Sequence, residues 1–376
     1  MEFEKTWIWQ DDKYPDFEYD KGALSASVLR VAHNSGRLDG ILTTLGVQKS
    51  NALKVESSIN EIITSSQIEG EVLDRQSVRS SVLKRIDSRA TLKDTSTNHT
   101  DGLVAMFMDS STNHSPLTLE RLNGWHHTLF PDGYSGLYKI RVAKFREEEM
   151  SVVSYRQGRE QTHYIAPPPD TLAGEMDAFL RFVNAAEEEP YTKAAIAHFW
   201  FVTIHPYDDG NGRIARAITN YVLSKELGLN DGYYSISTAI VEDKKRYYEL
   251  LERSQKLMHN KNLELTQWIV WHTDMINKAI EISLQQVQIA IQKANFWDRA
   301  RQYTLNARQT KVLNKLLDAG VDGFEGGLST KKYISIAKTS PATAKRDIAD
   351  LVSKSLLSQV EGTAGRGVRY VVGLVG

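Results

Sequence analysis

The chain has 376 residues, of which 41% are hydrophobic and 25% are charged, a balance typical of a folded globular protein rather than a disordered or membrane one. The absence of cysteine excludes disulfides, thiolate metal sites and a cysteine nucleophile, so any metal must bind to oxygen or imidazole. The length predicts two or three domains. The formal net charge is −1, but residues 301–376 carry 12 Lys and Arg against 6 Asp and Glu, and this basic tail on an acidic remainder indicates two roles.

The N-terminal residues lack the basic stretch followed by an apolar one that marks a secretory signal. No run approaches the roughly 20 apolar residues of a membrane span, so we expect a cytoplasmic protein with no membrane partner. Residues 1–20, rich in aromatic and acidic side chains, predict an irregular segment on the surface of a core. Apolar residues then recur at helical spacing from about 23 to 46, with a break expected at Ser35-Gly36.

Further helices are predicted from the same periodicity. One carries apolar residues from Leu53 to Ile63 and ends at Gly70, a natural helix stop. Residues 149–165 contain two apolar stretches around Gln157-Gly158-Arg159, which predicts a small two-stranded flap. The predicted fold is therefore mainly α, with a β-hairpin on a helical body whose other helices lie at about 72–86, 117–130, 171–187, 190–204 and 212–227.

The C-terminal part begins with a long helical run at about 263–300. Shorter helices are predicted at 307–318, 329–337 and 340–354, the last with Ser340 as its cap and Pro341 at its first position. Two apolar stretches between 356 and 371 enclose three glycines, as in a two-stranded wing. This order resembles a winged helix-turn-helix module.

The segment from His205 to Arg216 reads HPYDDGNGRIAR and joins two predicted helices. In Gly210-Asn211-Gly212, backbone N–H groups can converge at a helix N-terminus, whose dipole favours anions. Arg213 and Arg216 are three residues apart on that helix, so both could bind phosphate oxygens with forked donors. The pattern predicts a site for two or more phosphates.

Two side chains of the same loop suit chemistry on a phosphate. Asp209 supplies a hard oxygen for a Mg²⁺ ion that bridges phosphates and completes its shell with water. A neutral imidazole at His205 could accept the proton of an incoming hydroxyl. Each feature alone is common in ordinary turns and solvated helices, whereas their occurrence in one loop favours a catalytic site.

The segment resembles the Fic family signature, His-Pro-Phe-x-Asp/Glu-Gly-Asn-Gly-Arg-x-x-Arg, with Tyr207 in place of the usual phenylalanine. The resemblance covers roughly residues 50–275 and implies an ATP- and Mg²⁺-dependent protein adenylyltransferase, which moves AMP onto a hydroxyl side chain of a protein substrate or of itself. The hairpin would be the Fic flap, which aligns the target backbone by strand addition. The implied roles are His205 as the base, Asp209 as the magnesium ligand, Gly210, Asn211 and Gly212 as the anion hole, and Arg213 and Arg216 as phosphate ligands, with Arg216 at the γ-phosphate.

The resemblance also bears on the nucleotide. The related Doc kinases have a lysine at the second glycine, so Gly212 favours AMP transfer over phosphate transfer. Residues 245–251 resemble the adenine-side helix of the family, which implies Tyr248 as the base contact and Gln255 as a further candidate. The alternative is that these side chains pack in the core.

Residues 65–70, Ser-Ser-Gln-Ile-Glu-Gly, resemble the Fic inhibitory motif, Ser/Thr-x-x-x-Glu-Gly/Asn. The resemblance implies that Ser65, Glu69 and Gly70 form this motif and that Glu69 pairs with Arg216. A carboxylate on that guanidinium would remove a phosphate donor and repel the γ-phosphate. The alternative is an ordinary residue at a helix end.

The domains predicted on this basis are an N-terminal segment at 1–48, an inhibitory-helix region at 49–115, a Fic catalytic core at 116–275, a linker helix at 276–300 and a winged helix-turn-helix at 301–376.

A second hypothesis makes the chain a DNA-binding regulator with a nucleotide-sensing Fic part, because Thr343, Lys345 and Arg346 begin the candidate recognition helix. That module could instead dock a protein or a second copy of the chain, which would give a homodimer. A third hypothesis reverses the reaction and removes AMP, with Glu69 positioning a water.

Overall fold

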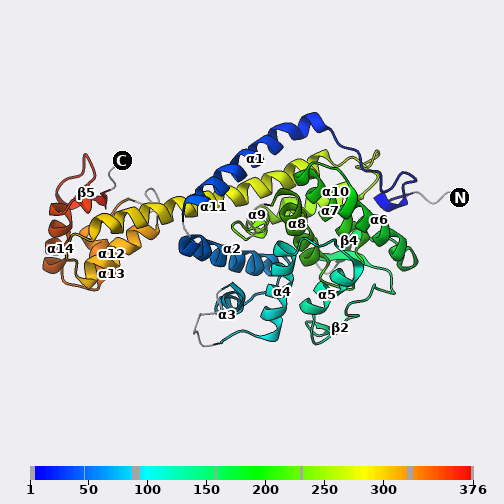
Figure 1. Cartoon of the computed structure of the whole chain (residues 1–376), viewed down its shortest axis with the longest axis horizontal. Coiled ribbons are helices and arrows are strands. Elements are labelled where there is room, and N and C mark those ends of the chain that lie inside the picture. Colours follow the sequence, from blue (N-terminus) through cyan, green and yellow to red (C-terminus); the bar gives the residue numbers. More distant parts are fainter. Residues whose placement is uncertain are drawn as a thin grey trace. The chain divides into compact units, whose positions relative to one another are not determined.

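The computed structural model describes residues 5–45, 47–86, 94–156, 159–228, 232–319, 324 and 326–373. It divides into two compact units, Met1–Ser283 and Leu284–Gly376, with the division inside the long helix α11 (Thr266–Ala300). Helices make up most of the described chain and three short two-stranded sheets complete it, so the prediction of a mainly α fold with a small hairpin is confirmed (Figure 1). In the described ranges, no helix has both the length and the apolar character needed to cross a membrane.

The first unit begins with a 3₁₀ turn that is followed by helices. The break expected at Ser35-Gly36 is wrong, because α1 continues through both residues. A glycine costs a helix only about 1 kcal/mol, and the neighbouring buried side chains make tertiary contacts: Asn34 Nδ2 donates to Asn277 Oδ1 at 2.9 Å, and the Ser35 and Tyr191 hydroxyls lie 3.0 Å apart. These first elements are η1 (Ile8–Gln10), α1 (Lys21–Thr44), α2 (Val47–Ile68), α3 (Arg75–Ile86) and α4 (Asn98–Thr112), the last of which was not predicted.

Helix α7 (Pro190–Ile204) forms the centre of the first unit. All its residues from Tyr191 to Ile204 are buried, because its apolar side chains extend around the whole helix. Glu189 caps it by accepting the N–H groups of Tyr191 and Thr192 at 3.1 and 2.8 Å. Helices α6 (Leu172–Ala185) and α8 (Asn211–Leu227) pack directly on α7. The same unit contains α5 (Leu119–Leu129), α9 (Ile236–Glu242) and α10 (Lys244–Gln255).

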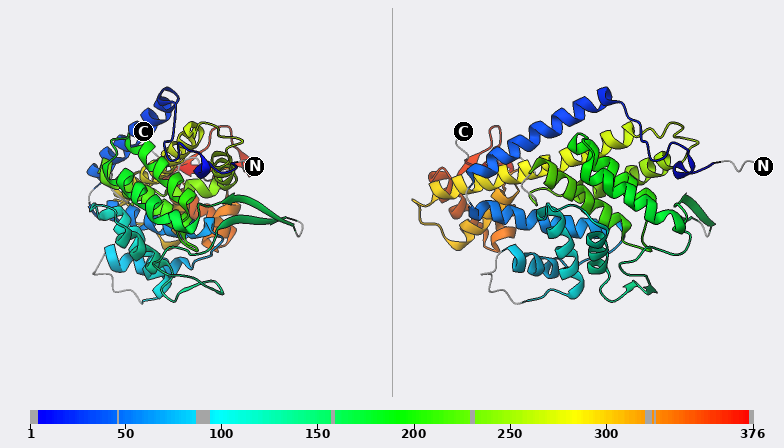
Figure 2. Two further views of the ribbon diagram at one scale, coloured as in Figure 1. Left: turned by 90° about the vertical axis from the view of Figure 1, so that its right-hand side faces the viewer. Right: turned by 45° about the vertical axis from the view of Figure 1, so that its right-hand side comes forward.

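Two antiparallel hairpins belong to the first unit. Strands β1 (Tyr134–Ser135) and β2 (Tyr138–Lys139) form a small one, which was not predicted. The predicted flap is present as β3 (Ser151–Arg156) and β4 (Arg159–Ile165), which extend away from the helices (Figure 2). The expected turn at Gln157-Gly158 lies outside the described residues.

The second unit packs three helices and a short sheet around its own apolar core. After α11 come α12 (Ala307–Asp318), α13 (Thr330–Ala337) and α14 (Pro341–Ser353), which confirm the predicted helices within two residues. Ser340 caps α14 by accepting the N–H of Thr343 at 3.3 Å. The strands β5 (Leu357–Gln359) and β6 (Tyr370–Val372) pair antiparallel and are shorter than the apolar stretches in the sequence, and a 3₁₀ turn (Gly365–Gly367) separates them.

A buried carboxylate connects the helices of the second unit. Asp347 on α14 is 5% exposed and accepts hydrogen bonds from Arg308 Nε at 2.9 Å, Asn306 Nδ2 at 3.1 Å and the Tyr333 hydroxyl at 3.0 Å. Burial would raise the pKa of Asp347, but these hydrogen bonds lower it overall. The carboxylate is therefore ionised and joins α12 and α13 to α14.

Candidate functional site

The predicted catalytic histidine ends α7 in a left-handed backbone conformation. His205 has φ +51° and ψ 58°, which is uncommon for a residue other than glycine, and its N–H donates to Phe201 O at 3.0 Å. Arg146, which is 2% exposed, donates from Nε to His205 O at 2.8 Å and from its backbone N–H to Pro206 O at 3.0 Å. Arg146 thus fixes the start of the loop.

The environment of the His205 ring sets its protonation state. Nδ1 lies 3.2 Å from Val202 O, and because a carbonyl only accepts, Nδ1 carries the proton and Nε2 keeps a lone pair. Burial lowers the pKa of His205 below 6.5, and the Val202 carbonyl opposes this shift only in part. The imidazole is therefore neutral near pH 7, as a general base requires.

The turn after His205 depends on close packing and on an asparagine. Asn211 donates to Tyr207 O at 2.8 Å and accepts from Tyr207 N at 3.1 Å, so one side chain closes the turn. Gly210 has φ +81°, and a Cβ there would lie 2.8 Å from the Phe130 ring. The Tyr207 hydroxyl donates to Asn123 Oδ1 at 2.8 Å, which satisfies the extra polar group of this tyrosine.

Asp209 lies at the rim of the turn, with 43% of its side chain exposed. Its Oδ2 accepts a hydrogen bond from the Ser135 hydroxyl on β1. Within the described ranges, no group of three or more His, Asp or Glu side chains could bind a metal by itself. One carboxylate beside an anion site suits Mg²⁺, which keeps water ligands and binds through substrate phosphates.

Arg216, on the second turn of α8, is 2% exposed and contacts the predicted inhibitory segment at the end of α2. Its Nη2 donates to Glu69 Oε1 at 2.8 Å and to Ser65 O at 2.9 Å, and its Nε donates to Ser65 Oγ at 2.9 Å. The structure therefore brings Ser65, Glu69 and Arg216 together. A Cβ at Gly212 would lie only 2.3 Å from Glu69 Oε1, so the absence of a side chain there leaves room for this carboxylate.

Arg213 is 6% exposed and its guanidinium lies over the Phe130 ring, 4.9 Å from the ring centroid. Its Nη1 donates to Glu71 Oε2 at 3.1 Å, and its Nη2 lies 4.0 Å from Asp209 Oδ1. Arg213 Nε and Arg216 Nη1 are buried without a hydrogen-bond partner among the described residues. Both side chains thus have donor capacity beyond their carboxylate contacts.

The two candidate base contacts on α10 differ in environment. Tyr248 is 41% exposed, and its hydroxyl donates to Ile68 O at 3.3 Å, which places it beside the inhibitory segment. Gln255 is 5% exposed and donates from Nε2 to Thr203 Oγ1 at 3.1 Å. Tyr248 therefore lies beside Glu69 and Arg216, whereas the Gln255 amide is hydrogen-bonded inside the core.

Sequence reasoning missed several side chains that contact these groups. Arg146 and Ser135 lie far from the motif in sequence, and no local pattern marked either one. Glu71 follows the inhibitory motif directly, so its negative charge could have been used to predict a second contact with the arginines of the loop. His99, whose Nε2 lies 2.5 Å from Glu71 Oε1, comes from α4, which was not predicted.

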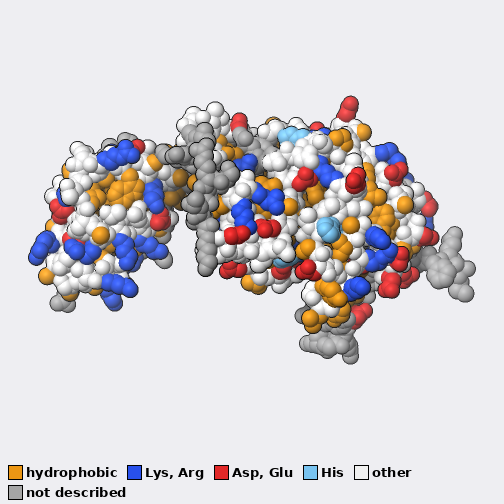
Figure 3. Space-filling model, turned by 60° about the horizontal axis from the view of Figure 1, so that its bottom comes forward, with side chains coloured by type: hydrophobic (Ala, Val, Ile, Leu, Met, Phe, Trp, Pro, Cys, Tyr) orange, Lys and Arg blue, Asp and Glu red, His pale blue; other side chains and the backbone are white. Residues whose placement is uncertain are grey.

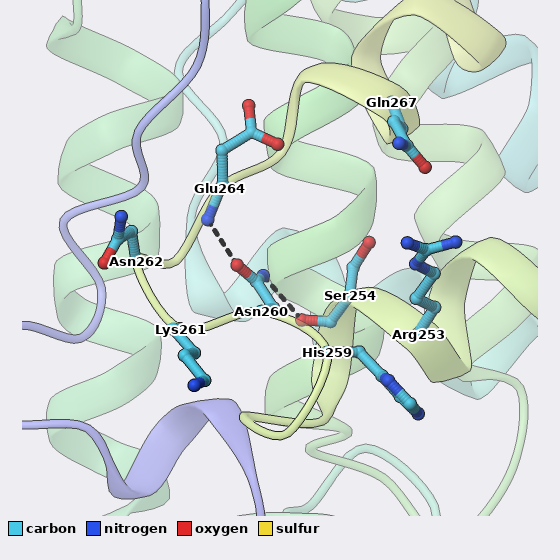
Figure 4. A pocket seen from close by; sticks show the side chains of 8 residues that line it. All are labelled: Arg253, Ser254, His259, Asn260, Lys261, Asn262, Glu264 and Gln267. Atoms are coloured by element: carbon cyan, nitrogen blue, oxygen red, sulfur yellow. Dashed lines mark hydrogen bonds between the residues drawn. The ribbon is translucent and has the colours of Figure 1, made fainter.

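A separate pocket lies at the C-terminal end of α10 and in the loop that precedes α11 (Figure 4). Asn260 closes its floor by donating to Ser254 O at 2.9 Å and accepting from Glu264 N at 2.6 Å. Arg253, His259 and Lys261 surround it. None of the predicted site residues lines this pocket, so it is distinct from the loop between α7 and α8.

Comparison with solved structures agrees with the helical fold. The chain is similar to a Fic family protein from Desulfovibrio desulfuricans, with a TM-score of 0.52 and 16% identity over 94% of this chain and 97% of that one. At this identity the likeness concerns the fold alone. The first unit and its hairpins thus define a Fic-like helical protein.

Comparison of sequences gives the family of the central region. Residues 116–223 match the Fic/DOC family, and residues 7–87 match a domain of unknown function (DUF4172). The chain therefore contains a DUF4172 domain followed by a Fic/DOC domain. It is 28% identical to a uridine 5'-monophosphate transferase of Xanthomonas campestris over 30% of this chain and 22% of the relative. It is 32% identical to a protein adenylyltransferase Fic of Nematostella vectensis over 24% of this chain and 21% of the relative. The chain spans about a fifth of the length of these relatives.

Proposed function

We propose that this chain transfers AMP from ATP to a hydroxyl side chain of a protein. The observation that carries the proposal is the loop at the start of α8, where the neutral His205 imidazole, the Asp209 carboxylate and two buried arginines lie on one twelve-residue segment. A base, a hard oxygen ligand and two phosphate-binding cations together suit a nucleoside triphosphate. The match of residues 116–223 to the Fic/DOC family supports the same proposal.

The chemistry assigns one task to each group. The target hydroxyl oxygen forms a bond to the α-phosphorus, the bond from that phosphorus to the bridging oxygen breaks, and pyrophosphate leaves. His205 Nε2 accepts the hydroxyl proton, and Arg213, Arg216 and the N–H groups of residues 210–212 bind the phosphates. Asp209 would bind Mg²⁺, which when present neutralises charge on the phosphates.

The flap formed by β3 and β4 would align the target. A hairpin that extends from the helical body offers an exposed strand edge to which an extended peptide can add. His163 Nδ1 lies 2.8 Å from Glu252 Oε2 on α10, which fixes the base of the flap to the helix that carries Tyr248. A target strand on this edge would bring its hydroxyl toward the loop.

We further propose that the protein inhibits itself through Glu69. The Glu69 carboxylate accepts a hydrogen bond from Arg216 Nη2 at 2.8 Å and lies against Gly212. This is where the anion hole would accept the terminal phosphate. Binding of ATP in a productive pose therefore requires this side chain to leave.

An alternative role for Glu69, positioning a water for removal of AMP, is tested by incubating the protein with a pre-modified target and measuring released AMP.

Transfer of UMP is a second candidate, supported by the similarity to the Xanthomonas transferase. The retained Gly212 favours nucleotidyl transfer but does not select the base. The test is to incubate the Glu69→Gly variant with ATP or UTP labelled at the α-phosphate and to analyse the purified chain by mass spectrometry. An added AMP supports the proposal, whereas addition of UMP alone would replace it with the second candidate.

For the second unit we propose a winged helix-turn-helix that binds duplex DNA. Lys345 and Arg346 are exposed on the N-terminal half of α14, and Lys and Arg side chains gather on the face of this unit that is in view in Figure 3. Counterion release makes such binding strongly salt-dependent. Absence of DNA binding at low salt would favour docking of a protein or of a second copy of the chain, which sedimentation of the full chain would detect.

A further inference from the structure

The turn that ends α2 presents a second carboxylate to the other arginine of the loop. Glu71 Oε2 lies 3.1 Å from Arg213 Nη1, and Glu71 Oε1 lies 2.5 Å from His99 Nε2. The Arg213 side chain is 6% exposed and the Glu71 side chain 31% exposed, so water screens the pair only partly. Both arginines that would bind phosphates are thus paired with carboxylates from residues 69–71.

We propose that Glu71 is a second inhibitory carboxylate, which pairs with Arg213 as Glu69 pairs with Arg216. In this proposal His99 is a positioning residue for Glu71. The inference rests on the proposed function of the loop. Loss of the Glu69 contact alone leaves Arg213 paired with a negative charge. A triphosphate that enters the loop must therefore displace two carboxylates.

The backbone of the turn explains why both carboxylates face α8. Glu71 N donates to Ser66 O at 3.0 Å and Gly70 N donates to Gln67 O at 3.1 Å, the two hydrogen bonds of a Schellman motif. Gly70 has φ +84°, the left-handed conformation that this motif requires. One local turn therefore sets the positions of Glu69 and Glu71, and its opening would release both arginines together.

His99 belongs to a different element and contacts the Glu71 oxygen that Arg213 leaves free. It lies in the first turn of α4, which Thr97 caps by accepting the N–H of Thr100 at 3.2 Å. The hydrogen bond to His99 lowers the pKa of Glu71, as does the charge of Arg213, although burial opposes both effects. Glu71 is therefore ionised and held between α4 and α8.

The test is calorimetric titration of the full chain with ATP and Mg²⁺, in a Glu69→Gln background that removes the negative charge paired with Arg216. Adding Glu71→Gln removes the second charge and retains a hydrogen-bonding side chain of similar size. We expect about tenfold tighter MgATP binding in the double variant than in Glu69→Gln, the size expected for one partly shielded charge contact. Gln67→Ala, an exposed residue of the same helix, is the matched control and should leave binding unchanged.

Equal or weaker MgATP binding in the double variant would overturn the role of Glu71, provided that its unfolding temperature matches that of Glu69→Gln. His99→Gln should tighten binding in the Glu69→Gln background and have no effect once Glu71→Gln is present. An equal effect in both backgrounds would overturn the positioning role, because His99 would then act independently of Glu71. If Glu69→Gln itself binds no MgATP, the proposed function fails together with this inference, whereas binding without an effect of Glu71→Gln refutes this inference alone.

Discussion

Replacement of Glu69 by glycine is expected to activate the protein, and the contacts of Arg216 set the size of the effect. The substitution removes the acceptor 2.8 Å from Arg216 Nη2 and empties the space against Gly212. A hydrogen bond to a charged group contributes about 1.5–3 kcal/mol, and each 1.4 kcal/mol corresponds to roughly tenfold. Because the Glu69 side chain is 31% exposed, screening favours the lower half of this range. We therefore expect an increase of about 10- to 40-fold in kcat/KM.

The assay is incorporation of label from α-labelled ATP into the chain and into proteins of a cell lysate, at several ATP concentrations. Gln67→Ala, on the same helix, controls for disturbance of α2. The Glu69→Gly/Arg216→Ala double variant should lose the increase in kcat/KM, because Arg216 is the group that Glu69→Gly frees. Unchanged incorporation by Glu69→Gly, in a variant that remains folded and still binds MgATP, would refute the inhibitory role.

The other predictions concern the base, its pH dependence and the second unit. His205→Ala should reduce AMP incorporation by about 10²- to 10⁴-fold while MgATP binding persists in calorimetry; full activity would exclude the base role. Because the pKa of His205 is lowered, the rate should fall only as the pH drops below 6.5, and a midpoint above 6.5 in the pH–rate profile would contradict a buried neutral base. Asp347→Asn should cost the second unit about 1–3 kcal/mol by leaving Arg308 and Tyr333 poorly paired, measured as a lower unfolding temperature in calorimetry. Lys345→Ala/Arg346→Ala should weaken binding of the full chain to duplex DNA and flatten its salt dependence, and unchanged binding would place the DNA contact elsewhere.

Local sequence patterns predicted most helices because their causes are local. The apolar run of α7, Gly70 after α2, and Ser340 with Pro341 at α14 each act within a few residues. The expected break at Ser35-Gly36 failed because tertiary hydrogen bonds of Asn34 and Ser35 support a continuous α1. Helix α4 was missed because serine, threonine and asparagine at its ends dilute its apolar pattern.

For the candidate site, the sequence indicated the loop but not its surroundings. The order of residues 205–216 was sufficient to predict a histidine, a carboxylate and two arginines close together, because one turn and one helix carry them all. Contacts that depend on tertiary packing could not be obtained this way. Arg146 reaches the His205 carbonyl from 59 positions upstream, and His99 meets Glu71 from another helix.

The most direct test of the central claim is calorimetric titration of the Glu69→Gly/His205→Ala variant with ATP and Mg²⁺, in which binding is measured without turnover. The account predicts saturable binding of one nucleotide per chain, which weakens when Arg216→Ala is added. No binding of MgATP by a folded variant would contradict the claim that the turn before α8 binds a triphosphate.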